Sequence, residues 1–193
     1  MTPGRGRTRH GGWRPHRPRS ARAACGAVLA VLTLAGCGTA GYGAPVAPSP
    51  MTVNSEAFIS GMLAQRYTCH GTRINPPLNW SGAPPGTKSL AIIVDDSSAP
   101  ITPFIYWLVF HINPGTTDIQ EGSLPTGARQ AKNSAGTVGY DAPCPSHLHL
   151  YRFTVYALRT AINLPNGAPL PEVVTAIAAV TIGRGRIVVT GNP

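Results

Sequence analysis

Three short segments rich in branched and aromatic apolar residues constrain what this chain can fold into. The first, Ser89 to Asp95, follows the turn signal Pro84-Pro85-Gly86, and the second, Phe104 to Ile112, stops at Asn113-Pro114-Gly115. Apolar runs of this length between turn residues are typical of buried β-strands. The sequence therefore predicts two core strands, at 89–95 and 104–112.

The third segment, His149 to Leu158, has two distinct faces, because side chains two residues apart lie on the same side of a strand. The first face carries His149, Tyr151, Phe153, Val155 and Ala157, and we expect it to pack against the core. The opposite face carries Leu150, Arg152, Thr154, Tyr156 and Leu158.

The C-terminal part of the chain predicts one helix and one more strand. Pro171 and Glu172 precede the apolar stretch 173–180, and a proline and an acid in the first turn are typical of a helix start. The final strand is predicted at 186–190, and Arg184-Gly185-Arg186 is interpreted as a solvated turn. Several strands, many Gly and Pro, and one late helix favour a mainly β fold, an antiparallel β-sandwich of Greek-key type with one or two short helices.

The positive charge of the chain is concentrated near its beginning. Seven arginines lie between Arg5 and Arg22 without an acid among them. The rest of the chain therefore has nine Lys and Arg residues and seven acids. These remaining residues contribute only +2 to the net charge of +9. DNA binding depends on many phosphate contacts from cationic side chains, so we expect no nucleic-acid partner.

The arginine-rich segment leads into an export signal. The stretch 23–34 is apolar and uncharged, and it is shorter than the roughly 20 residues that a transmembrane helix needs. The residues that follow, Leu34-Ala35-Gly36-Cys37, resemble the lipobox of bacterial lipoproteins, in which Cys37 receives a lipid and becomes the new N-terminus. Ordinary secretory cleavage near Ala40 or Ala44 is the alternative.

The sequence thus divides into three parts. It predicts a signal peptide with lipobox at 1–37, a flexible tether at 38–50, and one folded domain at 51–193. Acyl chains on Cys37 would hold the exported domain on the cell membrane, facing outside the cytoplasm. Outside the cytoplasm two leftover cysteines usually pair, so Cys69 and Cys144 are predicted to form a disulfide, with two buried free thiols as the alternative.

Four segments stand out in the folded part of the chain. In chain order they are Asn75-Pro76-Pro77-Leu78-Asn79-Trp80, Asp96-Ser97-Ser98-Ala99-Pro100, Gly139-Tyr140-Asp141-Ala142-Pro143-Cys144-Pro145 and His149-Leu150-Tyr151-Arg152-Phe153-Thr154-Val155-Tyr156. Together they resemble the signature of the phosphatidylethanolamine-binding protein family, in its bacterial Raf-kinase-inhibitor-like branch of YbhB/YbcL type. The resemblance implies a pocket at the rim of the β-sandwich that accepts a phosphate-like anion. Members of the family are also known as inhibitors of kinases and peptidases.

The resemblance assigns pocket residues position by position. Asp96 matches the first acid of the family pattern, whereas its second acid is Ser98 here. The later motif contributes His149 and Tyr151, and the backbone near Pro143 completes the expected ligand-binding set. Alternation along the strand places Asp95 and Asp96 on opposite faces, so only one of them can enter a pocket. We expect Asp96 to orient His149 or to meet an amine of the ligand. A core-edge histidine bonded to a backbone carbonyl and a solvated strand end are the alternatives.

Two positions depart from the family pattern. Bacterial relatives usually have a His where this chain has Tyr106, so a donor whose charge depends on pH is replaced by a neutral phenol. The closing Gly-Thr-Tyr-like segment is replaced by Val189-Thr190-Gly191, which offers no aromatic residue. We therefore expect weaker and less pH-dependent anion binding, with Tyr106 as a fifth member of the set.

Motifs of common enzymes and metal sites are missing. The sequence has no Gly-x-Ser-x-Gly, no His-Glu-x-x-His and no Cys-x-x-Cys, so we expect neither an enzyme nor a cofactor. His147 and His149 with Asp141 are a weak metal signal, and no metal is predicted.

The sequence thus favours a receptor for a phosphate-bearing small molecule or lipid headgroup. A docking protein or inhibitor for an extracytoplasmic peptidase or kinase ectodomain is the alternative, followed by a hydrolase that uses His149 with a metal or Ser146.

Overall fold

The computed structural model describes residues 48–99 and 101–193. The predicted signal peptide and lipobox at 1–37, including Cys37, and the predicted tether up to residue 47 lie outside the described residues. The last two residues of that tether form the first short strand of the sheet described below. No helix in the described part of the chain has the length and apolar character needed to cross a membrane.

Six strands form the larger sheet. Across it they are β1 (Ser49–Pro50), β9 (Thr181–Gly191), β8 (His149–Leu158), β4 (Ser89–Asp96), β5 (Phe104–Ile112) and β7 (Arg129–Gln130). Neighbouring strands run antiparallel except β1, which runs parallel to β9. The three strands predicted from apolar patterning are confirmed, and they lie together as β8, β4 and β5.

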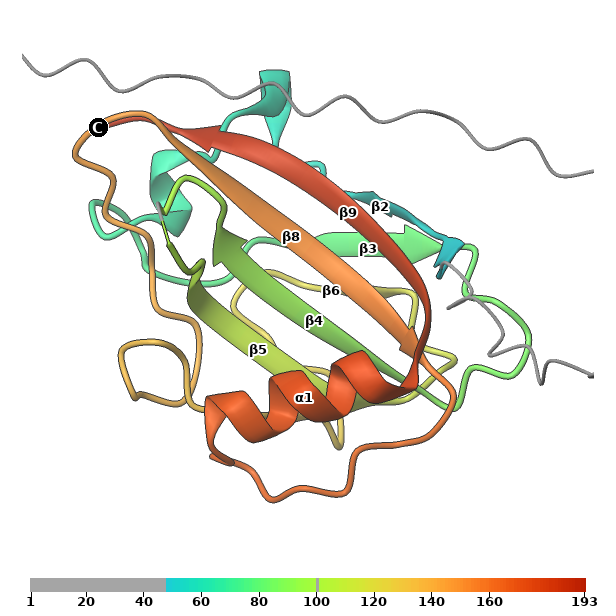
Figure 1. Cartoon of the computed structure of the whole chain (residues 1–193). Helices are drawn as coiled ribbons and strands as arrows, with labels where there is room; N and C mark the ends of the chain where they lie inside the picture. The colour runs from blue at the N-terminus through green and yellow to red at the C-terminus, as the bar shows by residue number, and fades with distance from the viewer. Residues whose placement is uncertain (1–47, 100) are drawn as a thin grey trace, which may run out of the picture. The chain divides into compact units, whose positions relative to one another are not determined.

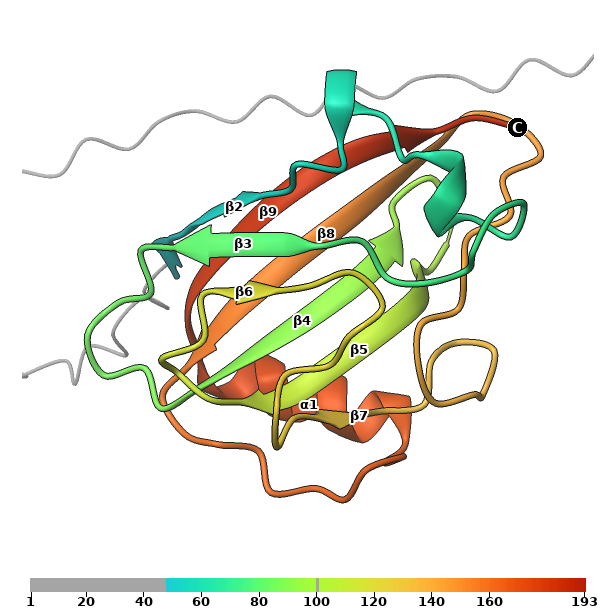
Figure 2. The ribbon, with the colours of Figure 1, turned by 180° about the vertical axis from the view of Figure 1, so that it is seen from behind.

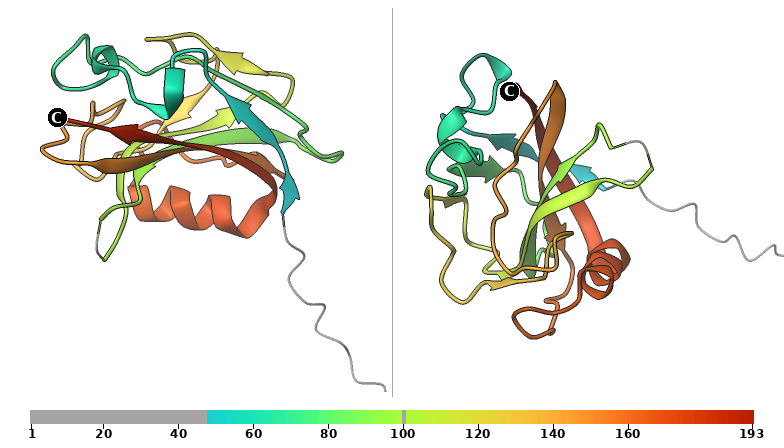
Figure 3. Two further views of the ribbon diagram at one scale, coloured as in Figure 1. Left: turned by 90° about the horizontal axis from the view of Figure 1, so that it is seen from above. Right: turned by 90° about the vertical axis from the view of Figure 1, so that its left-hand side faces the viewer.

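A smaller, three-stranded sheet and one α-helix cover the two faces of this sheet. The smaller sheet has the order β2 (Thr52–Asn54), β3 (Leu78–Ser81) and β6 (Asp118–Ile119), and two short 3-10 helices, η1 (Ile59–Gly61) and η2 (Gln65–Tyr67), lie between β2 and β3 in the chain. The predicted C-terminal helix is confirmed as α1 (Leu170–Val180). Figures 1 and 2 show α1 on one face of the larger sheet and β2, β3 and β6 on the other, and Figure 3 shows the three layers edge on.

Two apolar cores fill the spaces between these layers. The core under the smaller sheet joins Trp80 of β3 to Ile92 of β4 and Phe153 of β8, all nearly or fully buried. The core under α1 joins Val173 and Ile177 of the helix to the larger sheet. The mainly β prediction with one late helix is confirmed, whereas the Greek-key order of the strands stays a prediction.

Burial corrects the expectation for β8, because both of its faces are covered. The predicted core face is buried from Tyr151 to Ala157, yet Thr154 and Leu158 of the other face are also fully buried. The reason is α1, whose core includes Leu158. Alternation in the sequence therefore marked which residues share a face, but not that the second face also has a covering layer.

The last strand is longer than predicted, and the interpretation of Arg184-Gly185-Arg186 as a turn is wrong. β9 begins at Thr181, directly after α1, and pairs with β8 along its whole length. Its glycines permit close packing, because a Cβ on Gly185 would lie 2.4 Å from the carbonyl oxygen of Met51. The glycines that suggest a turn in the sequence instead let β9 approach the N-terminal strands closely.

Candidate functional site

Three of the predicted site residues meet at one end of strands β4 and β8. The register places Asp96 opposite Tyr151, with His149 two residues earlier on the same face. The Asp96 Oδ2 lies 2.6 Å from His149 Nδ1, and the exposed fractions of these two side chains are 5% and 21%. An ionised carboxylate only accepts hydrogen bonds, so Nδ1 donates and Nε2 is directed elsewhere.

The loop after β4 is fastened to the start of β8, which fixes the position of Asp96. Its second carboxylate oxygen, Oδ1, accepts a hydrogen bond from the backbone nitrogen of Ser98 at 2.7 Å. The Ser98 hydroxyl in turn accepts one from the backbone nitrogen of Leu150 at 2.8 Å, and Ser97 donates to the carbonyl of Leu150. Ser98, which replaces an acid of the family pattern, therefore joins the two segments that carry Asp96 and His149.

Aromatic rings extend the site from His149 inward. The imidazole of His149 lies parallel to the ring of Tyr151, with centroids 6.0 Å apart. The ring of Tyr106 meets that of Tyr151 edge to face, with centroids 5.6 Å apart. The structure thus brings four predicted residues, Asp96, Tyr106, His149 and Tyr151, into one cluster.

Tyr106 reaches this cluster because β5 contains a bulge. Val94 of β4 pairs with Trp107, and the next residue, Asp95, pairs with Ile105, so Tyr106 is the extra residue in the ladder. Consequently Tyr106 and Trp107, although adjacent in sequence, both pack against the core under the smaller sheet. Bulges redirect side chains in this way and are common beside functional sites. The displaced backbone also leaves the Tyr106 carbonyl free to accept a hydrogen bond from the Asp141 nitrogen, at 2.9 Å.

The hydroxyl of Tyr151 is the most unusual polar group of the cluster. Tyr151 is fully buried, and its hydroxyl makes no hydrogen bond of ordinary length with any residue that the structure describes. Burial, above all, raises the pKa values of Tyr151 and Tyr106, and the charge of Asp96 raises both further, whereas the nearby Tyr151 hydroxyl lowers that of Tyr106. Both phenols are therefore neutral at physiological pH and can donate a hydrogen bond to a negatively charged group.

Gly191 makes room for the ring of Tyr151. This glycine is paired with His149 across the sheet, and a Cβ on it would lie 2.3 Å from Cε2 of Tyr151. The segment that in the sequence looked like the loss of an aromatic closing residue therefore has a role of its own, because only glycine at this position allows the buried phenol to sit where it does.

A cavity of about 500 Å³ lies next to Tyr106. Its wall is formed by Cys69, Arg73, Phe104, Tyr106, Tyr140, Asp141, Ala142 and Cys144. Tyr106 is the one residue that belongs both to this wall and to the cluster with His149. Pro143 does not line the cavity, because it is buried between two lining residues and its carbonyl accepts a hydrogen bond from the Cys69 nitrogen at 2.9 Å.

Two residues of this wall, Arg73 and Tyr140, were not predicted from the sequence. Tyr140 donates its hydroxyl hydrogen to the carbonyl of Tyr67 at 3.0 Å, and Tyr67 donates to Glu121, so a chain of hydrogen bonds supports this wall. Tyr140 is part of the motif Gly139 to Pro145, and its aromatic side chain could have indicated a pocket residue. Arg73 gave no signal, because its place in the wall depends on a loop whose path the sequence does not reveal.

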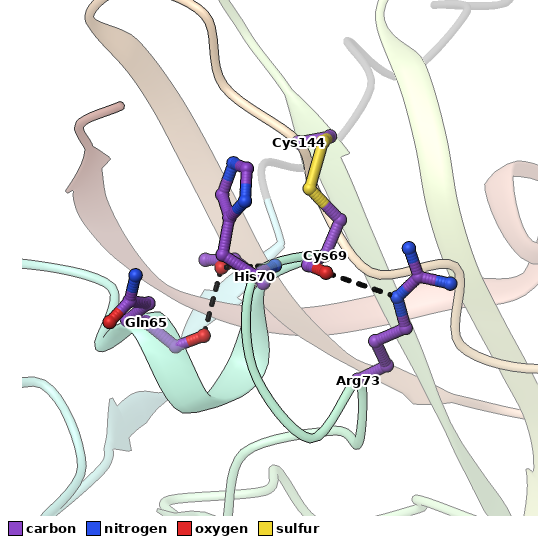
Figure 4. The surroundings of a disulfide bond; sticks show 6 residues. Gln65, Cys69, His70, Arg73 and Cys144 are labelled. Carbon is purple, nitrogen blue, oxygen red and sulfur yellow. Dashed lines mark hydrogen bonds between the residues drawn. A yellow bond between two sulfur atoms is a disulfide. The ribbon is translucent and has the colours of Figure 1, made fainter.

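The predicted disulfide between Cys69 and Cys144 is confirmed. The two Cα atoms are 5.1 Å apart, and the bond joins the loop after η2 to the loop before β8. Figure 4 shows His70 on one side of the sulfur atoms and Arg73 on the other. The bond therefore connects two of the segments that form the cavity wall, so its loss would loosen that wall.

Asp95 has a different role from its neighbour. It forms an ion pair with Arg152 on the other face of the sheet, where Arg152 Nε lies 3.0 Å from Asp95 Oδ2. The hydrogen bond with Asp95 is the main cause that raises the pKa of Arg152. The expectation that only one of the two acids enters the site agrees with this arrangement.

Two other arrangements considered from the sequence look different in three dimensions. Ser146 Oγ lies 3.1 Å from Nδ1 of His147, not of His149. The rings of His147 and His149 are close, with centroids 4.2 Å apart, whereas Asp141 lies in the cavity wall with Tyr106. Cys69, His70 and Cys144 have potential metal-ligand atoms within 4.8 Å of one another, but the two sulfur atoms form the disulfide.

A larger hollow, of about 670 Å³, lies between α1 and the residues 160–164. Its wall is mostly apolar and includes Ala176, Ala179 and Val180 of the helix. None of the residues in the Asp96 and His149 cluster belongs to this wall. Size therefore does not identify the site, and the polar groups described above are the better guide.

Comparison with known proteins agrees with the fold. Residues 53–192 match the family model described as phosphatidylethanolamine-binding protein. A UPF0098 protein of Methanothermobacter thermautotrophicus is 40% identical over 145 residues, which cover 72% of this chain and 96% of that protein. A Mycobacterium tuberculosis protein named "Putative lipoprotein LppC" is 38% identical over 148 residues, covering 75% of this chain and 73% of that one. The crystal structure of Escherichia coli YbcL, described as a member of the mammalian PEBP family, superimposes with a TM-score of 0.69 at 29% identity, over 74% of this chain and 98% of YbcL. The chain belongs to the phosphatidylethanolamine-binding protein family.

Proposed function

We propose that this protein is an exported, lipid-anchored member of the family that binds a phosphate-bearing small molecule or lipid headgroup without changing it chemically. One observation carries the proposal: the hydrogen-bonded Asp96 and His149 lie beside the fully buried Tyr151, whose hydroxyl has no partner among the described residues. Buried polar groups are nearly always hydrogen-bonded, so a group without a partner suggests that a ligand supplies one.

The three groups have complementary tasks in this proposal. Asp96 accepts the Nδ1 hydrogen of His149 and orients the imidazole, so that an Nε2 hydrogen of this ring can be donated to an oxyanion. The hydroxyls of Tyr151 and Tyr106 donate to further oxygens of the same anion, since their raised pKa values keep them protonated. No step of this scheme forms or breaks a covalent bond.

A pair of matched tyrosine variants tests the proposal. Tyr151→Phe removes only the buried hydroxyl, whereas Tyr156→Phe removes a hydroxyl from the opposite face of the same strand. Hydrogen bonds to charged groups contribute roughly 1.5–3 kcal/mol, so we expect Tyr151→Phe to weaken phosphate or phosphoethanolamine binding about tenfold or more in calorimetric titration. Tyr156→Phe should bind like the unmodified protein. Equal affinities in all three proteins would contradict the proposed site.

Export and lipid anchoring are part of the proposal. They are supported by the Leu34-Ala35-Gly36-Cys37 motif and by the name of the mycobacterial relative. Cys37→Ala should move the protein from the membrane fraction to the soluble fraction, and a variant that stays membrane-bound would exclude this mode of attachment. If the protein turned over phosphoester substrates and His149→Ala abolished this turnover, hydrolysis would replace binding as the proposed function.

A second function, docking to an extracytoplasmic enzyme, is favoured by apolar residues around His149. The side chains on either side of it, Leu148 and Leu150, are 63% and 42% exposed. Exposed apolar residues around a polar centre are typical of protein interaction sites. If the protein docks to an enzyme, the double change Leu148→Ser and Leu150→Ser should release the protein partner while leaving phosphate affinity unchanged. If it is a headgroup receptor, the double variant should still bind its membrane ligand.

A further inference from the structure

We propose that Arg73 supplies the positive charge that recognises the anion, and that the phosphoryl group of the ligand occupies the cavity between Arg73 and Tyr106. This inference rests on the proposed function and adds a specificity-determining residue to it. Both residues line the cavity of about 500 Å³ described above. Among the described residues that line it, Arg73 is the one cation, and Asp141 is the one acid.

The backbone of Arg73 is held in an unfavourable conformation. Its φ is +63°, in the left-handed region that residues other than Gly, Asn and Asp rarely adopt. Two hydrogen bonds maintain this turn, from the nitrogens of Thr72 and Arg73 to the carbonyl of Arg66. The neighbouring disulfide holds the same loop against the segment before β8. The surrounding structure thus determines where this side chain starts.

The side chain of Arg73 is only partly used by the protein. The residue is exposed, and its Nε donates to the carbonyl of Cys69 at 3.2 Å (Figure 4). Its two terminal nitrogens make no hydrogen bond with any residue that the structure describes. Arg66, in the preceding helix η2, is different because its terminal nitrogen forms an ion pair with Glu121 at 2.5 Å. A planar guanidinium with its two terminal nitrogens available is well suited to a phosphoryl group.

The opposite side of the cavity needs a cation nearby if it is to hold an anion. Tyr106 is neutral because its pKa is raised, mainly by burial, and Asp141 adds a carboxyl group to the wall. The cluster next to Tyr106 contains the carboxylate of Asp96. The charge of Arg73 would offset these carboxylates, and a guanidinium keeps its charge throughout the physiological pH range.

Inorganic phosphate is the probe for the test, titrated into the full chain, with phosphoethanolamine as a second probe. Arg73→Asn removes the charge but retains a residue that tolerates positive φ, and Arg73→Lys retains the charge without the planar fork. Arg66→Gln, in the neighbouring helix η2, is the matched control. We expect affinity to fall about tenfold or more in Arg73→Asn, less in Arg73→Lys, and not at all in Arg66→Gln.

A measurement on the unmodified protein keeps the test valid if a variant fails to fold. Phosphate should shift the NMR signal of the Arg73 Nε–H group and leave that of Arg66 in place. Unmodified protein that binds phosphate, with a weakened Tyr151→Phe variant but an unshifted Arg73 signal or an unaffected Arg73→Asn variant, would overturn this inference alone. Absence of binding of either probe by the unmodified protein would overturn the proposed function with it.

Discussion

Replacing Cys69 and Cys144 with alanine removes the covalent bond between two walls of the cavity while changing little buried surface. The bond closes a loop with a sequence separation of 75 residues. For a loop of this size the chain-entropy relation gives a stabilisation of about 4.5 kcal/mol, because the cross-link restricts the unfolded chain. Cys144 is exposed and Cys69 half-buried, so lost packing should add little to this figure.

Urea unfolding of the full chain, followed by tryptophan fluorescence, measures the loss. With an m value of about 2 kcal/mol/M, the midpoint of the double variant should fall by about 2 M relative to the oxidised protein. Unmodified protein kept reduced throughout the titration is the control, and it should unfold near the midpoint of the double variant. A fall of less than about 0.5 M would refute the reasoning, since the unfolded state would then not be restricted by the bond.

Three further predictions concern the aromatic cluster. Gly191→Ala should destabilise the fold by about 1–3 kcal/mol and weaken phosphate binding, because its Cβ would lie 2.3 Å from the ring of Tyr151, whereas Gly115→Ala, whose Cβ meets its nearest neighbour at 3.3 Å, should do neither; equal urea midpoints would refute this. Stability should fall as pH rises above about 10, since tyrosines of the unfolded chain then ionise while Tyr151 and Tyr140, whose pKa values are raised by burial, stay protonated; Tyr151→Phe should make this decline shallower in urea midpoints measured at several pH values, and an unchanged slope would contradict it. Tyr106→His should strengthen phosphate binding at acidic pH and add a pH dependence between about pH 5 and 8, and calorimetric affinities that match the unmodified protein across that range would show that position 106 does not contact the anion.

Apolar patterning predicted the centre of the fold well, because strands β4 and β5 are covered on both faces and their sequences have to be apolar, whereas β8 was found by its alternation. It predicted β9 poorly. The glycines of that strand are needed where it approaches Met51 and Pro84, and close approach between segments far apart in the chain leaves no local signal.

The candidate site was predictable to the extent that it depends on alternation and on the family resemblance. Asp96, His149 and Tyr151 follow from one strand pairing, so two-residue periodicity was sufficient to group them. Tyr106 is different, since simple alternation places it on the same face as Leu108, under α1. The bulge moves it to the other face, and only the resemblance indicated this. Arg73 was missed because its position depends on a loop conformation with positive φ.

The adjacent acids at the end of β4 have a consequence for how faithfully the strand has to be aligned during folding. Asp95 and Asp96 are chemically identical, so a slip of one residue against β8 would exchange them, and charge alone could not reject the error. The distinction has to come from the apolar residues before them, which alternate between the two cores, with the small Ala91 facing α1 and the larger Ile92 facing the smaller sheet. The volumes of the buried side chains in β4 thus determine which of the two acids faces the site. We expect substitutions such as Ala91→Ile to disturb the site from a distance.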